Sequence, residues 1–177
     1  MKTVVNLRHA QRQDRSDQHS HLSKLGVDQA RRVGSRFEHF DLVVTSPLAR
    51  AVETAIAMGF SVDLYEPLLC EFDMAVMREP EWDTGYGYAS WSNAYSSGRL
   101  VYEYVRQREP LILSWLESVP ANGSLLIVSH GGVVEALTLA LVKDADFRSL
   151  GDDPDYVEGI IAEVREGGSC DLKPVRA

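Results

Sequence analysis

The sequence predicts an α/β fold in which a largely parallel central sheet carries helices on both faces. Short apolar runs such as Val4 to Leu7 and Leu125 to Val128 alternate with longer stretches of helical spacing. This alternation is typical of parallel strands joined by crossover helices. The chain has 177 residues, 45% hydrophobic and 25% charged, which favours one domain over residues 1–177 with a substantial core.

The first half of the chain is predicted to form a strand over 3–7, a helix over 23–37, a strand over 41–45, a helix over 46–59 and a strand over 62–65. Ser23 is placed to cap the first helix with its side chain. Ser46 is predicted to cap the second, with Pro47 at the first helical position, where a missing N–H costs nothing. The core-facing residues of that second helix are predicted to be Leu48, Val52, Ala55 and Ile56.

The second half begins with the least regular part, residues 69–98. Its aromatic residues are expected to form either a lid over the substrate or a small satellite core: Trp82, Tyr86, Tyr88, Trp91 and Tyr95. A helix over 100–119 follows, in which Pro110 either introduces a kink or starts a second helix. A strand over 124–128, a helix over 132–142 and a C-terminal hairpin of 160–164 with 170–175 complete the prediction. The hairpin would add an antiparallel edge to the sheet.

Composition excludes several classes of function. The net charge of −8 argues against a nucleic-acid-binding protein, which usually needs a basic face. No apolar stretch approaches the roughly 20 residues that span a bilayer, so no membrane partner is expected. Cys70 and Cys170 lie far apart and are expected to be reduced thiols of a cytoplasmic protein. No phosphate-loop or dinucleotide glycine motif occurs, so no cofactor is expected.

Polar segments follow three of the predicted strands, at residues 7–10, 45–55 and 129–133. The carboxyl ends of parallel strands meet at one edge of a sheet, where ligands bind. These segments would bring together two arginines and two histidines: Arg8, His9, Arg50 and His130. Arginine holds phosphate oxygens with a planar fork of donors, and a neutral imidazole is a competent nucleophile toward phosphorus. The segments therefore predict phosphoryl chemistry.

In this order, the three segments resemble the histidine phosphatase superfamily, also called phosphoglycerate mutase-like. The resemblance runs from about Val4 to about Leu141, and its most specific element is the Ser-Pro-Leu-x-Arg-Ala-x-Glu-Thr-Ala stretch that starts at Ser46. It implies a metal-independent phosphatase that hydrolyses phosphomonoesters through a phosphohistidine at His9. It also implies that Arg8, Arg50, His130 and Gly131 hold the phosphoryl group and that Glu71 protonates the leaving group.

Two departures from the family pattern qualify this reading. Ala10 stands where the family motif Arg-His-Gly has glycine, which would tighten the pocket if the local backbone needed a positive φ. Residues 72–75 do not match the glycine and Trp-Glu-Gly motif of the mutase branch, and this favours a phosphatase. Two alternatives stay open: a phosphomutase with the same intermediate, and a catalytically weak protein that binds a phosphorylated ligand and acts in regulation.

Other assignments compete at single positions. The competitors of Glu71 for the acid role are Glu66, Asp73, Glu79 and Glu81. Gln11, Arg12 and Arg15 are candidates for binding the rest of the substrate, although a solvated charge cluster would account for the two arginines. Arg50 alone could instead be an ion-pair partner of Glu53. His19 and His21 do not have the spacing of a metal site, so no metal is expected.

These motifs do not identify the substrate, because neither the fold nor the residues that bind the phosphoryl group specify the leaving group. A phosphorylated small molecule is the expected partner, with a phosphoprotein as the alternative. A homodimer is compatible with the resemblance, which includes monomeric and dimeric members.

Overall fold

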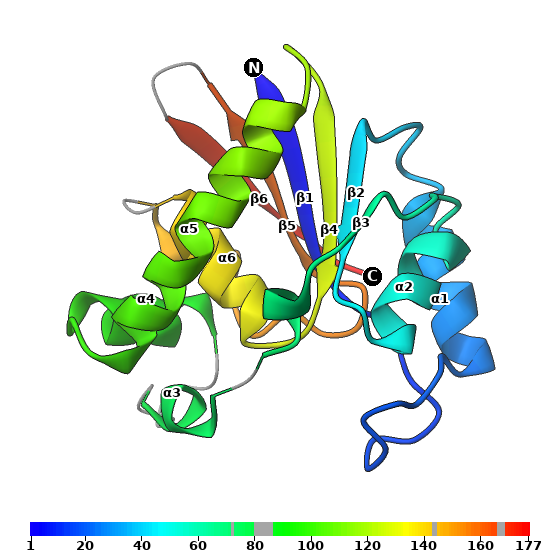
Figure 1. Ribbon diagram of the computed structural model, residues 1–177, viewed down its shortest axis with the longest axis horizontal. Coiled ribbons are helices and arrows are strands. Elements are labelled where there is room, and N and C mark those ends of the chain that lie inside the picture. Colours follow the sequence, from blue (N-terminus) through cyan, green and yellow to red (C-terminus); the bar gives the residue numbers. More distant parts are fainter. Residues whose placement is uncertain (72, 80–86, 143–144, 166–168) are drawn as a thin grey trace.

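A computed structural model describes residues 1–71, 73–79, 87–142, 145–165 and 169–177. The described residues form a six-stranded sheet with the strand order β3-β2-β4-β1-β5-β6 (Figure 1). Its strands are β1 (Lys2–Arg8), β2 (Leu42–Thr45), β3 (Leu64–Tyr65), β4 (Ser124–Ser129), β5 (Gly159–Val164) and β6 (Cys170–Val175).

The sheet is mixed, as the sequence predicts. Strands β1, β4, β2 and β3 pair in parallel, whereas β5 runs antiparallel to both β1 and β6. The predicted C-terminal hairpin is therefore confirmed, although its turn at 166–168 lies outside the described residues. The carboxyl ends of β1, β2 and β4 share one edge, so the segments that follow these strands are neighbours in space.

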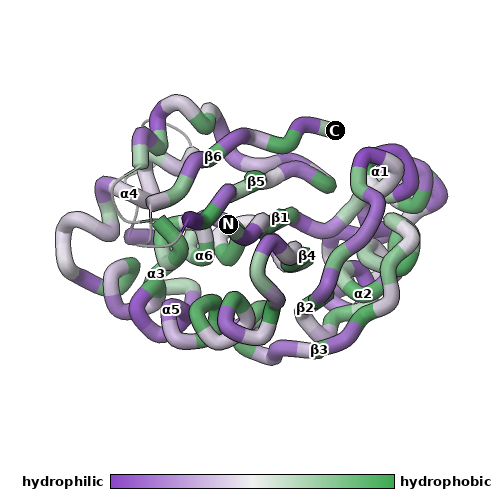
Figure 2. The backbone as a smooth tube through the Cα atoms, turned by 90° about the horizontal axis from the view of Figure 1, so that it is seen from above, coloured by the Kyte–Doolittle hydropathy of each residue, from purple (hydrophilic) through white to green (hydrophobic). Residues whose placement is uncertain are grey.

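Helices cover both faces of the sheet (Figure 2). One face carries α1 (Lys24–Gly34) and α2 (Ala49–Ala57), and the other carries α4 (Tyr88–Ser96), α5 (Leu100–Ser118) and α6 (Val133–Leu141). Successive strand residues point to opposite faces. Accordingly, Leu125 and Ile127 join the core under α5 and α6, while Leu126 and Val128 join the core under α1 and α2. Short elements complete the fold: α3 (Met74–Arg78), η1 (Pro67–Leu69) and η3 (Phe147–Leu150).

Helix α2 differs from its prediction in both start and orientation. It begins at Ala49 with Leu48 as the N-cap residue, so the predicted cap at Ser46 is wrong. The Ser46 hydroxyl is instead hydrogen-bonded to His130. The buried side chains of the helix are Arg50, Ala51, Thr54 and Ala55. Ile56 is 59% exposed, which contradicts its predicted place in the core, because the helix turns Arg50 and Thr54 toward the sheet edge.

Helix α1 is capped by Ser23 as predicted, since the Ser23 hydroxyl accepts the Gly26 N–H at 3.0 Å. The helix ends at Gly34 rather than at residue 37. A Cβ at Gly34 would lie 2.2 Å from the carbonyl oxygen of Met58, so this glycine lets α1 pack closely against the end of α2. Glycine is required at such a close approach of two backbones.

The stretch predicted to be irregular contains α3 and α4. Tyr88 and Trp91 are each 1% exposed and belong to the main core, so α4 is fixed by burial of its aromatic side chains. Trp82 and Tyr86 lie outside the described residues. Helix α5 is continuous through Pro110, which therefore does not start a second helix.

Two predictions about the whole chain concern sulfur and membranes. Cys70 and Cys170 are free cysteines. Among the described residues, no helix combines the length and the hydropathy that crossing a membrane requires.

Candidate active site

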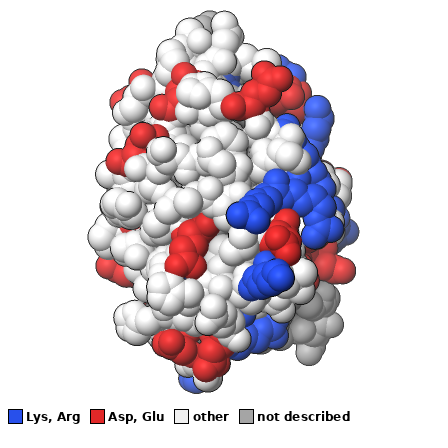
Figure 3. Space-filling view, turned by 90° about the vertical axis from the view of Figure 1, so that its right-hand side faces the viewer, with Lys and Arg blue, Asp and Glu red and all other residues white. Residues whose placement is uncertain are grey.

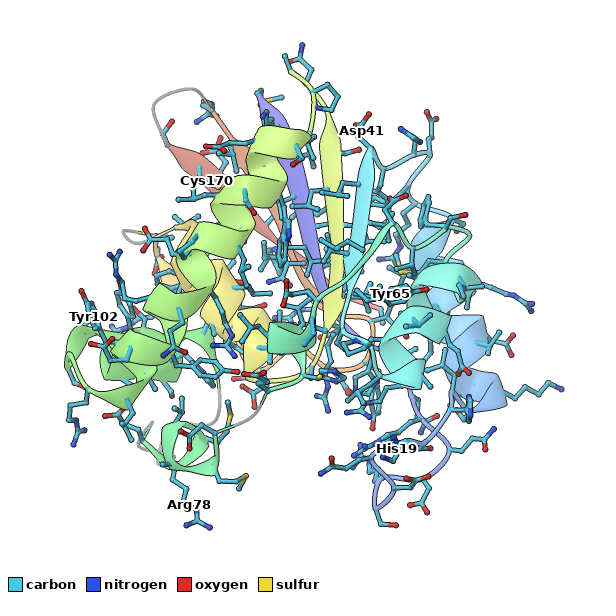
Figure 4. All side chains as sticks on the ribbon, viewed as in Figure 1. His19, Asp41, Tyr65, Arg78, Tyr102 and Cys170 are labelled. Carbon is cyan, nitrogen blue, oxygen red and sulfur yellow. The ribbon has the colours of Figure 1, made fainter. Side chains whose placement is uncertain are left out.

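The segments that follow β1, β2 and β4 meet in a pocket of about 360 Å³ that contains His9 and His130 and is called the histidine pocket below. Four of the predicted site residues line it together: Arg8, His9, Arg50 and His130. Gly131, Arg12 and Arg15 contribute to the same lining. Figure 4 shows His19 and Arg78 on two segments that project from one end of the molecule, opposite the end that carries Asp41 at the start of β2. The pocket therefore lies at the carboxyl edge of the sheet, as the sequence predicts.

His9 is held by two hydrogen bonds that fix its orientation. Its Nδ1 lies 2.7 Å from the carbonyl oxygen of Ala10, and its Nε2 accepts the Nε–H of Arg50 at 3.2 Å. A carbonyl oxygen only accepts and a guanidinium only donates, so both bonds require the proton on Nδ1. The lone pair of Nε2 is consequently directed toward Arg50, inside the pocket.

The environment of His9 keeps its ring neutral. Burial is the largest cause, and the positive charges of Arg50 and Arg8 add to it, which together lower the pKa of His9 to about 3. The ring is 5% exposed. A neutral imidazole with one unprotonated nitrogen, here Nε2, can attack phosphorus.

His130 lies beside His9, with ring centroids 5.1 Å apart and an interplanar angle of 61°. Its Nε2 shares a hydrogen bond of 2.7 Å with the Ser46 hydroxyl, so β4 and the segment after β2 are joined at the pocket. Burial, followed by the neighbouring His9 and Arg50, lowers the pKa of His130 to about 2. The ring is thus neutral at pH 7 and donates through one nitrogen only.

The arginines are arranged around Tyr156, a residue that the sequence analysis did not single out. The guanidinium carbon of Arg8 lies 4.8 Å from the centroid of the Tyr156 ring, and that of Arg15 lies 5.5 Å from it. Arg15 also donates its Nε–H to the Tyr156 hydroxyl at 3.0 Å. Stacking on an aromatic face restricts a guanidinium without consuming its donors. Tyr156 therefore orients two cations toward the pocket.

Arg50 and Arg12 are held by backbone carbonyls. Arg50 donates to the oxygen of Gln18, and Arg12 donates to the oxygens of Asp17 and, at 2.7 Å, of Arg15. Burial lowers the pKa of Arg50 to about 10, which leaves it charged at neutral pH. These contacts fix the loop of residues 12–18 at the pocket, which Arg12, Arg15 and Gln18 line.

The structure does not support the alternative pairing of Arg50 with Glu53. Glu53 pairs with His21 and accepts the Leu22 N–H at 2.7 Å, so it is not the partner of Arg50. The charge of Glu53 and its hydrogen bond raise the pKa of His21. In the described part of the chain, no group of three or more His, Cys, Asp and Glu side chains is placed to hold a metal ion.

Gln11 and Glu71 are the predicted site residues that do not line the histidine pocket. The Gln11 side chain contacts the Ser23 hydroxyl at 3.2 Å, next to the start of α1. Glu71 lines a separate cavity together with Glu103, although its neighbour Cys70 borders the histidine pocket. The structure thus places Glu71 near the pocket edge without bringing its carboxylate to the two histidines.

The other carboxylates proposed from sequence have structural partners elsewhere. Glu66 accepts the Leu68 N–H at 3.0 Å, and Asp73 accepts the Ala75 N–H at 2.7 Å, so each caps a short helix. Glu79 pairs with Arg99 at 3.0 Å. Glu81 lies outside the described residues.

Two further carboxyl groups stand close to Arg8. Asp153 and Glu135 line an adjoining cavity that shares Arg8 and Gly131 with the histidine pocket. Burial raises the pKa of Asp153 to about 6 and that of Glu135 to about 8. Sequence reasoning missed both, because neither belongs to one of the three polar segments.

Ala10 fits its position without strain. It is fully buried, and its N–H donates to the Thr54 hydroxyl at 2.9 Å, while that hydroxyl donates to the Arg50 carbonyl at 2.6 Å. The described non-glycine residues with positive φ are Asn122 and Val157, so Ala10 has ordinary backbone. Alanine in place of glycine is therefore compatible with this turn.

The surface beside the site is mixed in charge. Figure 3 shows basic side chains gathered on one half of the face that carries α1 and α2, with acidic side chains among them and along its margin.

Comparison with known proteins identifies a family and a common fold. The model of the histidine phosphatase superfamily (branch 1) matches residues 4–154. No curated protein matches the chain by sequence. A phosphoserine phosphatase from Entamoeba histolytica in complex with 3-phosphoglyceric acid aligns with a TM-score of 0.68 and 18% identity, covering 97% of this chain and 95% of its own.

Two bacterial structures align over similar lengths. A mycobacterial glucosyl-3-phosphoglycerate phosphatase has a TM-score of 0.64 and 22% identity, over 97% of this chain and 95% of its own. The Bacillus stearothermophilus protein YhfR has a TM-score of 0.65 and 21% identity over the same shares, 97% and 95%. The predicted phosphoglycerate mutase-like fold is thereby confirmed.

Proposed function

The chain belongs to the histidine phosphatase superfamily, and we propose that it hydrolyses phosphomonoesters through a phosphohistidine formed at His9, without a metal ion. The observation that supports this most strongly is the orientation of His9. Its proton is held on Nδ1 by Ala10, and the lone pair of Nε2 faces a pocket lined by Arg8 and Arg50.

In the first step, Nε2 of His9 attacks the phosphorus of the substrate and the ester oxygen leaves. In the proposed complex, the Nε–H of Arg50 turns from Nε2 of His9 to hydrogen-bond one phosphoryl oxygen, and Arg8 binds another. Two guanidinium groups neutralise the charge on the equatorial oxygens of the transition state. The buried, neutral ring of His9 needs no deprotonation before it attacks.

In the proposed step, His130, which lines the same pocket, donates a hydrogen bond to the transferring group. The Ser46 hydroxyl is hydrogen-bonded to Nε2 of His130 and so fixes the orientation of the ring. We assign Ser46 a positioning role, because its contact is to His130 and not to a reacting atom.

The departing alkoxide needs a proton, and two carboxyl groups are candidates to supply it. Glu71 is the residue that the family resemblance indicates. Asp153 is the second candidate, supported by its place beside Arg8 and by a pKa raised to about 6, which retains a proton for donation in weakly acidic solution. The same carboxylate would then activate the water that releases phosphate from His9.

A small phosphorylated molecule is the proposed substrate, since the histidine pocket measures about 360 Å³ and the adjoining cavity about 420 Å³. Cavities of this size accommodate metabolite-sized ligands. A phosphoprotein would have to present its phosphorylated residue on an extended, exposed segment.

Hydrolysis of an aryl phosphate in the presence of a chelator tests the proposal. The wild-type protein should release phosphate, and His9→Ala should not. Glu71→Gln and Asp153→Asn are compared as a pair. The variant that loses turnover of an alkyl ester but keeps turnover of an aryl ester with a good leaving group identifies the acid. Phosphate release that persists in His9→Ala would refute the proposal, and transfer to a second hydroxyl of the substrate would indicate a mutase.

A further inference from the structure

The cavity beside the histidine pocket has a composition of its own. It shares Arg8 and Gly131 with that pocket and measures about 420 Å³. A phosphoryl group held by Arg8 would therefore lie next to this cavity. The cavity is close enough to receive whatever alcohol the phosphate is attached to.

One wall of the cavity is apolar and rigid. Trp91 is 1% exposed, and its ring packs 6.4 Å, centroid to centroid, from that of Tyr104. A Cβ built on Gly132 would lie 2.8 Å from the Met77 sulfur and 3.3 Å from Cζ2 of Trp91. Both side chains thus pack directly on the backbone at the start of α6, two residues from His130. Indole and thioether surfaces favour aromatic and aliphatic groups.

The cavity is also lined by two carboxyl groups, those of Glu135 and Asp153. Glu135 is 2% exposed, and its Oε2 accepts the Gly132 N–H at 2.7 Å. Asp153 has a buried Oδ1 for which the described residues supply no hydrogen-bond partner. Burial raises the pKa of both groups, which shows that negative charge is disfavoured in this space.

In the described part of the chain, the cations that line the cavity are Arg8 and Arg78. Arg8 donates to the Pro154 carbonyl at 3.0 Å, and it also lines the histidine pocket. Arg78 is an exposed residue at the cavity rim, and Figure 4 shows its side chain extending away from the body of the molecule. A carboxylate deep in the cavity would lose its hydration, while the exposed Arg78 offers it a partner only at the rim.

We propose that this cavity binds the alcohol part of the substrate and selects an uncharged aromatic or aliphatic alcohol over one that carries a carboxylate. The inference rests on the proposed function and names the class of ester on which it acts. It separates this chain from a relative of the same fold whose structure holds 3-phosphoglyceric acid.

The test compares 4-methylbenzyl phosphate with 4-carboxybenzyl phosphate. The two esters have similar size and leaving alcohols of similar acidity, so a difference in kcat/KM reports recognition of the para substituent. The wild-type protein should prefer the methyl ester by about tenfold or more. Equal values, or a preference for the carboxylate, would overturn the inference.

Variants of Met77 locate the preference in the cavity. Met77→Lys places a cation on the apolar wall and should shrink or invert the ratio of the two kcat/KM values. Leu113→Lys, on an exposed position of α5, is the matched control and should keep the wild-type ratio. Met77→Ser should lower kcat/KM for the methyl ester without adding charge. A ratio that stays at the wild-type value in both Met77 variants would contradict the assignment.

Binding measurements separate this inference from the proposed function. Calorimetric titration of His9→Ala with the two esters gives the same comparison without turnover, and tighter binding of the methyl ester supports the inference even if hydrolysis fails. Similar hydrolysis of both esters by the wild-type protein would leave the phosphatase assignment standing and refute only the selectivity. Absence of hydrolysis together with equal affinities would refute both.

Discussion

The Nε–H of Arg50 donates a hydrogen bond to Nε2 of His9 across 3.2 Å, and this bond joins the first and second polar segments of the chain. It places a positive charge directly against the nitrogen proposed as the nucleophile. The charge helps to lower the pKa of His9, and the bond also covers the lone pair until an anion takes the donor. Arg50 therefore links protonation of His9 to occupancy of the pocket.

Arg50→Lys should lower kcat/KM for an aryl phosphate by about 100-fold or more, the usual effect of removing one donor to a transition-state oxygen. A lysine keeps the charge but lacks the planar fork that reaches both His9 and the phosphoryl group. Steady-state kinetics check this, with Arg31→Lys on the exposed surface of α1 as the control. Nearly unchanged kcat/KM in Arg50→Lys would show that charge alone suffices.

Ser46→Ala should lower kcat more than it raises KM, because the hydroxyl positions His130 and is not proposed to touch the substrate. The loss of a buried hydrogen bond should also cost about 1–2 kcal/mol of unfolding free energy. The ¹⁵N chemical shifts of the His130 ring should change, which a purely structural effect elsewhere would not cause. Ser114→Ala, an exposed hydroxyl on α5, provides the control; unchanged ring shifts in Ser46→Ala would contradict the positioning role.

Glu135→Gln should alter how stability depends on pH. The pKa of Glu135 is raised from 4.5 to about 8 in the folded protein, so its contribution is complete below pH 4.5 and is lost as pH rises through 8. Between pH 6.5 and 8, the wild-type free energy of unfolding should fall by up to about 1.4 kcal/mol per pH unit relative to that of Glu135→Gln.

Urea denaturation of both proteins across this pH range measures the difference between their free energies of unfolding. In that difference, the contributions of the titratable groups that the two proteins share cancel. His9 and His130, whose folded-state pKa values are lowered from 6.5, act in the opposite direction and only below pH 6.5. Parallel curves for the two proteins would show that Glu135 titrates normally.

Ala10→Gly should leave kcat/KM near the wild-type value and lower the free energy of unfolding by about 1 kcal/mol. The backbone of Ala10 is ordinary and its N–H bond to Thr54 does not depend on the side chain. The substitution removes a fully buried methyl group and adds freedom to the unfolded chain. A large gain in kcat/KM would instead indicate that the methyl group of Ala10 restricts the histidine pocket.

The sheet and most of its helices could be predicted because their signals are local. Apolar runs over 3–7 and 124–128 define the central strands, and alternation with helical spacing defines their parallel pairing. The site followed from the same logic, since residues placed after parallel strands meet at one edge. His9, Arg50 and His130 come together for this reason.

Long-range contacts account for what the sequence did not predict. Ser46 has the local signal of a helix cap, but its hydroxyl bonds His130, 84 residues away, and α2 begins three residues later. Tyr156 lies beside His9, with ring centroids 5.7 Å apart, because the segment before β5 folds back beside β1, where Val157 donates its N–H to the Arg8 carbonyl. No periodicity in the sequence predicts such a contact.

Helix α4 was missed for a related reason. Its residues are mostly small, polar or aromatic, and they lack the apolar stripe of a surface helix. The helix is stabilised by Tyr88 and Trp91, which are buried against other elements of the core. Tertiary burial of aromatic side chains, rather than local propensity, determines this element.

Trapping the covalent intermediate tests the central claim most directly. The protein would be mixed with an aryl phosphate and a chelator, quenched in alkali to preserve phosphohistidine, digested and analysed by mass spectrometry. We predict one phosphoryl group on His9 in the wild-type protein and none in His9→Ala. Steady release of phosphate without a label on His9, or a label that persists in His9→Ala, would contradict the account.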